Sequence, residues 1–321
     1  MKLENQSKIE EFILLGFVEF YEVQTFLFFT FLVIYVVIMT GNILIVAAVI
    51  FNQHLHTPMY FFLGNLSFLE ACYSSYIFPW MLSSLSTGDG SLSVTSCLMQ
   101  WYFCGSLLAT ECCLLGVMSY DRYLAISKPL HYFTTMNTQA CIHLAAASWL
   151  SSFIGFSILL SLMLQLTFCG PNEINHFICD YFPLLKLSCS DTSLIEILGL
   201  VLDAILILPP FVLTLTSYVY IIVAILKIPS TTGRQRAFST CSSHLIVVSI
   251  FYGSLMIVYM LPKGEGNREM QKFSSLLYLV LPPLANPFIY SLRNKEVQNA
   301  LRNNIGSLVS CKTTAKKLVN V

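Results

Sequence analysis

The sequence predicts an all-α membrane protein: a seven-transmembrane helix bundle with a short amphipathic cytoplasmic helix after the seventh span. The chain of 321 residues is 56% hydrophobic and only 11% charged, whereas soluble domains have about 25% charged residues. Seven apolar stretches each approach or exceed the ~20 residues that a helix needs to cross a bilayer. They are residues 23–50, 58–83, 97–126, 138–163, 194–227, 238–261 and 272–292. The alternating pattern of a β-barrel is absent.

Basic residues indicate which side of the membrane each loop occupies. Seven spans place the two termini on opposite sides. The loops on the side of the C-terminus hold eleven of the seventeen basic residues but only two acids, Asp121 and Glu296. The positive-inside rule therefore places the C-terminus in the cytoplasm of a plasma-membrane protein. We expect residues 1–22 to be extracellular, 23–292 to form the transmembrane domain and 293–321 to form a cytoplasmic tail.

Both predicted tails carry modification sequences. Asn5 begins an N-glycosylation acceptor pattern on the predicted outer side. No basic segment precedes an apolar core in the first 22 residues, so no cleavable signal peptide is predicted. Cys311, beside Lys312, is a candidate for palmitoylation.

Several spans contain polar residues. Asn42 in the first span is expected to make an interhelical hydrogen bond. Glu70 in the second span and Glu111 in the third are costly inside a membrane and should face the bundle interior. They form either a protonated structural pair or an ion or proton site. Asp203, in the outer half of the fifth span, is a third such acid that could line a cavity.

The ends of two spans point to functional features. The ionised pair Asp121 and Arg122 closes the third apolar stretch and should mark where that helix leaves hydrocarbon and meets water. The last span contains Pro282, Pro283 and Pro287. Proline removes backbone hydrogen bonds, so this helix should kink and is a candidate moving part.

Four cysteines are predicted to lie outside or at the outer edge of the membrane: Cys97, Cys169, Cys179 and Cys189. An oxidising exterior permits disulfides. Four cysteines allow three pairings, and the sequence does not choose among them.

Five motifs together resemble one family. They are residues 55–63 (LHTPMYFFL), 118–126 (MSYDRYLAI), 217–218 (SY), 236–245 (RAFSTCSSHL) and 286–294 (NPFIYSLRN). The chain resembles a rhodopsin-like G-protein-coupled receptor, and within that class a vertebrate odorant (olfactory) receptor, from about Phe12 to Leu301. One departure is notable: Glu70 stands where the family usually has Asp, which makes pairing with Glu111 less certain. Helix six has Phe251-Tyr252-Gly253 where most other rhodopsin-like receptors carry a Cys-Trp-x-Pro motif, as odorant receptors generally do.

The resemblance implies two disulfides, Cys97 to Cys179 and Cys169 to Cys189. It also implies that Arg122 and Tyr218 rearrange on activation while Tyr290 moves with helix seven. Helix six then opens a cytoplasmic cleft for a stimulatory, olfactory-type heterotrimeric G protein, which raises cyclic AMP. The expected switch and coupling residues are Asp121, Arg122, Tyr123, Tyr218, Arg236, His244, Asn286, Pro287 and Tyr290.

A small, volatile, mostly apolar odorant should bind in an outer transmembrane cavity lined by hydrophobic groups and a few polar ones. Helical spacing places one set of residues on a face of helix three and another on a face of helix six. The expected ligand-binding residues are Cys104, Gly105, Leu108, Ala109, Cys112, Asp203, Leu206, Ile207, Tyr252, Leu255, Met256, Tyr259 and Leu276.

Other features of the sequence bear on alternatives to an odorant receptor. A rhodopsin-like receptor for a non-odorant ligand outside the nose is an alternative. A proton-coupled transporter would use Glu70 and Glu111, but transporters often contain internal repeats and none is found. No motif brings together the groups of an enzyme active site, and no cofactor, resident metal or nucleic-acid partner is expected. His176, near Cys179 and Asp180, suits a loop hydrogen bond better than a metal ion.

Overall fold

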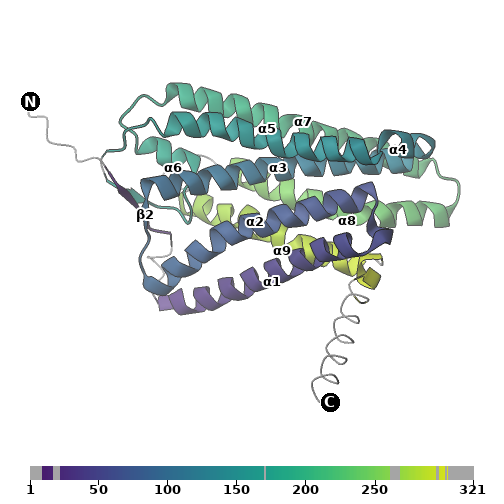
Figure 1. The fold of residues 1–321 in the computed structure, drawn as a ribbon, viewed down its shortest axis with the longest axis horizontal. Helices are drawn as coiled ribbons and strands as arrows, with labels where there is room; N and C mark the ends of the chain where they lie inside the picture. The colour runs from purple at the N-terminus through teal and green to yellow at the C-terminus, as the bar shows by residue number, and fades with distance from the viewer. Residues whose placement is uncertain are drawn as a thin grey trace, which may run out of the picture.

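The computed structural model describes residues 9–16, 22–169, 171–260, 268–293, 296–300 and 302. Within these ranges, seven long helices run side by side (Figure 1). They are α1 (Gln24–Phe51), α2 (Pro58–Thr87), α3 (Val94–Ser127), α5 (Thr138–Met163), α7 (Ser193–Leu226), α8 (Thr231–Met260) and α9 (Arg268–Arg293). The predicted seven-helix bundle is therefore confirmed.

Most of these helices have the character of membrane spans. Five of those described are long and apolar enough to cross a bilayer. A sixth, α8, qualifies when residues 231–239 and 241–257, which meet at a bend of 42°, are taken as one span. α2 has 30 residues, but it carries Glu70 and several serines and is less apolar. Its length of about 45 Å still exceeds the thickness of a hydrocarbon core.

Local sequence signals set where these helices begin and end. Pro58 occupies the first turn of α2, where its missing N–H has no helical partner to lose. Ser93 caps α3 by accepting a hydrogen bond from the Ser96 N–H at 3.1 Å, and Asn137 caps α5 by accepting from the Ala140 N–H at 2.9 Å. α2 ends at Thr87, and the next residue, Gly88, has a φ of 72°, a left-handed conformation that favours glycine.

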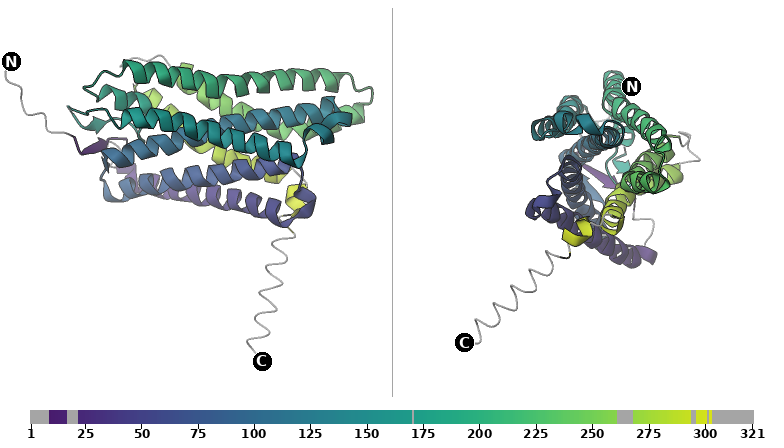
Figure 2. Two further views of the ribbon diagram at one scale, coloured as in Figure 1. Left: turned by 45° about the horizontal axis from the view of Figure 1, so that its top comes forward. Right: turned by 90° about the vertical axis from the view of Figure 1, so that its right-hand side faces the viewer.

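α3 occupies the centre of the bundle. It packs against α2, α5 and α7, while α1 packs along α2 and α8 packs along α9. The right-hand view of Figure 2 shows the helix bundle end-on. Of the membrane-capable helices, α3 is the most buried, whereas most of the surface of α1 and of α7 faces outward.

A small sheet closes one end of the bundle. β1 (Glu11–Leu14) lies between β2 (Ser91–Ser93), to which it is antiparallel, and β3 (Glu173–Ile174), to which it is parallel. Phe12 and Leu14 of β1 are buried. The all-α prediction missed these strands, because each is too short to give an alternating pattern. We call this end of the bundle the sheet end.

Three short helices complete the described fold. They are η2 (Gln53–Leu55), α4 (Pro129–Thr135) and α6 (Tyr181–Lys186). α6 lies near the sheet end, and α4 lies at the opposite end, which we call the α4 end (Figure 1).

A polar contact joins α1 to α9 in the interior. Pro287 has no N–H to donate to the carbonyl of Pro283, four residues earlier in α9. Asn42 of α1 donates its amide to that Pro283 oxygen at 3.3 Å. The predicted interhelical role of Asn42 is thus confirmed. Beside it, Gly41 allows close approach, since a Cβ atom there would lie 2.7 Å from the Pro287 Cβ.

The predicted surface helix after α9 is described only in part. Residues 296–300 are helical, Val297 and Ala300 are buried, and Glu296 accepts a hydrogen bond from the Tyr60 hydroxyl at 2.7 Å. This segment therefore packs against the bundle. Asn5 and Cys311, the predicted modification sites, lie outside the described residues.

We expect Gly41→Ala to destabilise the protein by about 1–3 kcal/mol, because the added methyl group must displace the rigid Pro287 ring. Gly64→Ala is the matched control. Its Cβ would meet only Val49, at 3.4 Å or more, and alanine favours a helix by up to about 1 kcal/mol. The thermal unfolding midpoint in detergent tests this: Gly41→Ala should lower it and Gly64→Ala should not. Equal midpoints would contradict the proposed tight contact.

Candidate functional site

A cavity of about 770 Å³ lies within the sheet end of the bundle. Its walls come from α2, α3, α5, α7, α8 and α9, and residues 173–187 form its cover. The volume is within the range typical of small-molecule sites.

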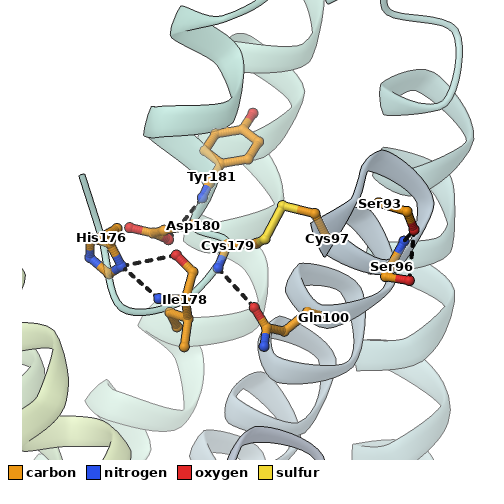
Figure 3. Close-up of a disulfide and its surroundings, with 9 residues drawn as sticks. All are labelled: Ser93, Ser96, Cys97, Gln100, His176, Ile178, Cys179, Asp180 and Tyr181. Carbon is orange, nitrogen blue, oxygen red and sulfur yellow. Dashed lines mark hydrogen bonds between the residues drawn. A yellow bond between two sulfur atoms is a disulfide. The ribbon is translucent and has the colours of Figure 1, made fainter. Parts of the chain in front are cut away.

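A disulfide fixes the cover to α3. Cys179 is bonded to Cys97 in the first turn of that helix (Figure 3). The Cys179 N–H also donates to the Gln100 side-chain oxygen at 2.9 Å. A second disulfide, Cys169 to Cys189, links the segment that precedes the cover to the segment that follows it. Of the three possible pairings, the structure has the one that the resemblance implies.

Hydrogen bonds hold the rest of the cover in place. Asp180 caps α6 by accepting from the Tyr181 N–H at 2.8 Å (Figure 3). The Tyr181 hydroxyl donates to the Ile195 carbonyl at the start of α7, at 2.6 Å, and its ring stacks on Trp101 of α3. The cover is thus joined to two of the helices that wall the cavity.

His176 joins the cover to α9. The ring Nδ1 lies 3.0 Å from the Ile178 carbonyl oxygen and 3.3 Å from the Ile178 nitrogen (Figure 3), and Nε2 shares a hydrogen bond of 3.2 Å with the Ser275 hydroxyl. Burial lowers the pKa of His176, against the opposing effects of the Asp180 charge and of the hydrogen bond to the Ile178 backbone, while the charge of Lys272 lowers the pKa further. The geometry is that of the loop hydrogen bond expected from the sequence.

The deeper walls of the cavity are apolar. Leu108 and Ala109 of α3, Ile207 of α7 and Leu255 of α8 line it. Gly105 lets α5 approach α3 closely, since a Cβ atom there would lie 2.2 Å from the Phe156 ring. These walls suit a hydrophobic ligand.

The intramembrane acids lie below this cavity. Asn286 of α9 donates a hydrogen bond to Glu70 of α2. Glu70 and Glu111 are close enough to interact electrostatically. The second oxygen of Glu70 and one oxygen of Glu111 have no hydrogen-bond partner among the described residues. Both acids are buried, as expected for acids that face the bundle interior.

A buried charge cluster lies at the α4 end. Asp121 has no exposed surface, forms an ion pair with Arg122 and accepts from the Tyr132 hydroxyl of α4 at 2.8 Å. The sequence placed the pair where α3 meets water. The pair does lie near that end of α3, where Asp121 bonds to Tyr132 of α4 and is buried within the protein.

Three more residues from other helices complete the cluster. Tyr218 of α7 and His244 of α8 share a hydrogen bond of 2.7 Å. Together with the buried Tyr290 of α9, they lie near enough to Arg122 to interact with its charge. The Tyr290 hydroxyl and the His244 Nε2 have no partner within the described part of the chain. Four helices therefore meet around Arg122.

Comparisons with known proteins agree with this geometry. The family model described as "Olfactory receptor" matches residues 31–306. Human olfactory receptor 11A1 is 47% identical over 294 residues, which cover 92% of this chain and 93% of the relative. Human olfactory receptor 10A3 is 48% identical over 301 residues, covering 94% and 96%.

The chain belongs to the olfactory receptor family. Its members are multi-pass membrane proteins that sense odorants as G-protein-coupled receptors, and this receptor is accordingly not an enzyme.

The structure brings together most of the expected pocket residues of the receptor. Those that line the cavity are Cys104, Gly105, Leu108, Ala109, Cys112, Asp203, Ile207 and Leu255. The Tyr259 side chain, like that of the switch residue Arg236, lies outside the described part of the structure.

Four expected pocket residues lie elsewhere. Leu206 packs on Gly155 of α5. Tyr252 contacts the Cys112 sulfur at 3.3 Å and packs on Phe211 behind the cavity wall. Met256 is 42% exposed on the outside of α8. Leu276 follows the lining residue Ser275 and packs among the helices. An apolar helix gives no sequence signal for its rotation about its own axis, so the sequence could not separate these residues from those that line the cavity.

One expected switch residue also lies apart from the cluster. The Tyr123 ring packs on Tyr220 of α7 and lies 5.8 Å from the Lys128 ammonium group. Tyr132, which contacts Asp121 directly, was not expected. Its position in the short α4 gave no hydrophobic period that would have identified it.

Sequence analysis also missed the cover of the cavity. Asp180, Tyr181 and Pro183 line it from above, and Tyr73 of α2 lines it from the side. A signal was present: once Cys179 is paired with Cys97 at the start of α3, the residues around Cys179 must lie over the bundle.

We expect the stability of the receptor to fall as the pH drops from near 6.5, the ordinary pKa of histidine, toward the lowered pKa of His176. In that interval the unfolded chain binds a proton that the folded protein does not, so acid favours unfolding by at most about 1.4 kcal/mol per pH unit. Thermal unfolding midpoints of purified receptor, measured across a pH series, test this. His176→Gln keeps hydrogen-bonding groups but cannot titrate, so its midpoint should depend less on pH. An identical pH profile would contradict the assignment.

Proposed function

We propose that this receptor binds a small, mostly apolar odorant in the cavity at the sheet end and activates a stimulatory, olfactory-type heterotrimeric G protein at the α4 end, raising cyclic AMP. The observation that carries the proposal is the arrangement along α3. Residues Cys104 to Cys112 line the cavity, and Asp121 and Arg122 of the same helix form the charge cluster. One rigid element therefore connects a ligand site to a cytoplasmic coupling site.

The orientation in the membrane is part of this proposal. The described basic residues Lys128, Lys227 and Arg234 lie near the α4 end, which supports a cytoplasmic position for that end. Both disulfides lie at the sheet end, where an oxidising exterior would allow them to form. The sheet end then faces the odorants.

The charge cluster supports a two-state mechanism. Arg122 is held by Asp121, while the Tyr290 hydroxyl is buried without a described partner. A buried polar group without a hydrogen bond costs about 1–3 kcal/mol, so a second arrangement that pairs it is energetically accessible. In the active state, Arg122 leaves Asp121 and meets Tyr218 and Tyr290. An odorant promotes this state only if it binds that state more tightly.

The helices that would move carry suitable breaks. α8 bends by 42° near Thr240, and α9 contains three prolines. Asn286 of α9 donates to Glu70 of α2, and the Pro283 carbonyl of α9 accepts from Asn42 of α1. A shift of α9 would therefore change these contacts and the position of Tyr290 together.

We expect Arg122→Ala to abolish odorant-dependent cyclic-AMP accumulation in cells that express the receptor with an olfactory G protein, because the mobile cation of the switch is lost. Arg234→Ala is the matched control. Arg234 is an exposed arginine near the same end whose guanidinium contacts the Ile228 carbonyl at 3.3 Å, so its loss should leave the response.

Surface labelling must show equal display of the variants. A full response in displayed Arg122→Ala would overturn the switch. A response to odorants through another G-protein class, with none through the stimulatory type, would overturn the choice of transducer and leave the ligand site standing.

A further inference from the structure

Asp203 directs a carboxylate into the cavity from the membrane-embedded part of α7. Gly199 and Ile207, one helical turn to either side of it, also line the cavity. The neighbouring Ala204 and Ile205 are exposed on the outer surface. The carboxylate therefore lies on the cavity face of α7 and not on its lipid face.

This carboxylate has no hydrogen bond or ion pair with the described residues. The other acids nearby each accept one hydrogen bond. Asp180 accepts from the Tyr181 N–H at 2.8 Å, and Glu196 accepts from the Thr192 hydroxyl at 2.7 Å. The Tyr181 hydroxyl is committed to the Ile195 carbonyl. An acid within a span costs about 2.5–3.5 kcal/mol on insertion scales, so a partner supplied by the ligand would offset a substantial penalty.

The charges around Asp203 favour a cation. Asp180 lies close enough to repel the Asp203 carboxylate, and its negative field reaches Cys104 on the opposite wall. Two lysines also line the cavity: Lys186, which is exposed at the end of α6, and Lys272 of α9. Lys272 places its ammonium group 5.2 Å from the centre of the Phe177 ring and interacts electrostatically with His176. A cation between Asp203 and Asp180 would relieve the repulsion between these two acids.

Below Asp203 the cavity is apolar. Ile207 lies one turn deeper, about 6 Å along the helix, and Leu108, Cys112 and Leu255 line the same region.

Tyr73 is an independent indication that the cavity can bind a polar ligand. This side chain is only 5% exposed, lines the cavity, and its hydroxyl has no partner among the described residues.

We propose that the receptor recognises primary aliphatic amines, with the ammonium group between Asp203 and Asp180 and the alkyl chain directed inward against Ile207, Leu108 and Leu255. This ligand class rests on the proposed odorant-receptor function. A charged head and an apolar chain match the two regions of the cavity, and an ion pair in a desolvated site gives discrimination against neutral molecules of the same length.

The test compares n-hexylamine with n-hexanol, which share a chain and differ in the charge of the head group. Cyclic-AMP accumulation is measured with the full-length receptor, an olfactory G protein and mock-transfected cells as background. Asp203→Asn keeps the shape of the side chain and removes its charge. It should raise the half-maximal concentration of n-hexylamine by at least about 30-fold, as expected for loss of one partner of a buried charge pair, and should not weaken any response to n-hexanol.

Glu196→Gln is the matched control, since Glu196 is an exposed acid on the same helix and its loss should leave the n-hexylamine response unchanged. An unchanged n-hexylamine response in Asp203→Asn would overturn the proposal. So would a larger loss for n-hexanol than for n-hexylamine, which would make Asp203 a hydrogen-bonding group for neutral odorants.

Silence of the unaltered receptor toward n-hexylamine would also overturn the amine class, and a broad panel of neutral odorants then decides the fate of the underlying function. A response to that panel would leave the odorant receptor standing with a different ligand class. Silence toward the whole panel, with the protein displayed at the surface, would overturn both.

Discussion

The interior of this bundle depends on the absence of water in the hydrocarbon around it. Each helix pairs its own backbone N–H and C=O groups by hydrogen bonds. Any polar group that is left unpaired within its helix must therefore find a partner on another helix. α9 illustrates this constraint. Pro287 leaves the Pro283 carbonyl free, and Asn42 of α1 takes it, while the adjacent Asn286 bonds to Glu70 of α2. The Pro283 carbonyl and the Asn286 amide, less than one helical turn apart, thereby join α9 to both α1 and α2.

The two ends of the receptor are built on different principles. At the sheet end, the cover is fixed by a covalent bond, by backbone hydrogen bonds and by the Tyr181 contact to α7, which favours a preformed cavity. At the α4 end, buried polar atoms of His244 and Tyr290 lack described partners around a single ion pair. A site with incomplete hydrogen bonding has more than one arrangement of similar energy, whereas a fully bonded one does not. The rigid end suits recognition, and the under-bonded end suits switching.

Much of the fold could be predicted because hydrophobic length fixes a span without reference to the rest of the chain. The start of α2 at Pro58 and the interhelical bond of Asn42 followed from properties of single residues. The rotation of each helix about its own axis could not be predicted from the sequence. α7 is apolar on nearly all sides, so the sequence could not show that Asp203 and Ile207 face the cavity while Leu206 packs on Gly155. β1 was missed for a related reason, since its partners are 80 and 160 residues away along the chain and too short to show a pattern.

The position of β1 has a consequence for the order in which the chain is assembled. Residues 11–14 are synthesised before any span, yet one of their two strand partners, β3, follows α5 in the sequence. β1 can pair with β2 once α2 has been made, but its pairing with β3 must wait until four of the long helices have emerged. The packing of Phe12 on Phe168, which also follows α5, is a long-range contact that forms only then. Biosynthesis thus leaves the sheet end of the bundle open until the segment that carries Cys179 has been made.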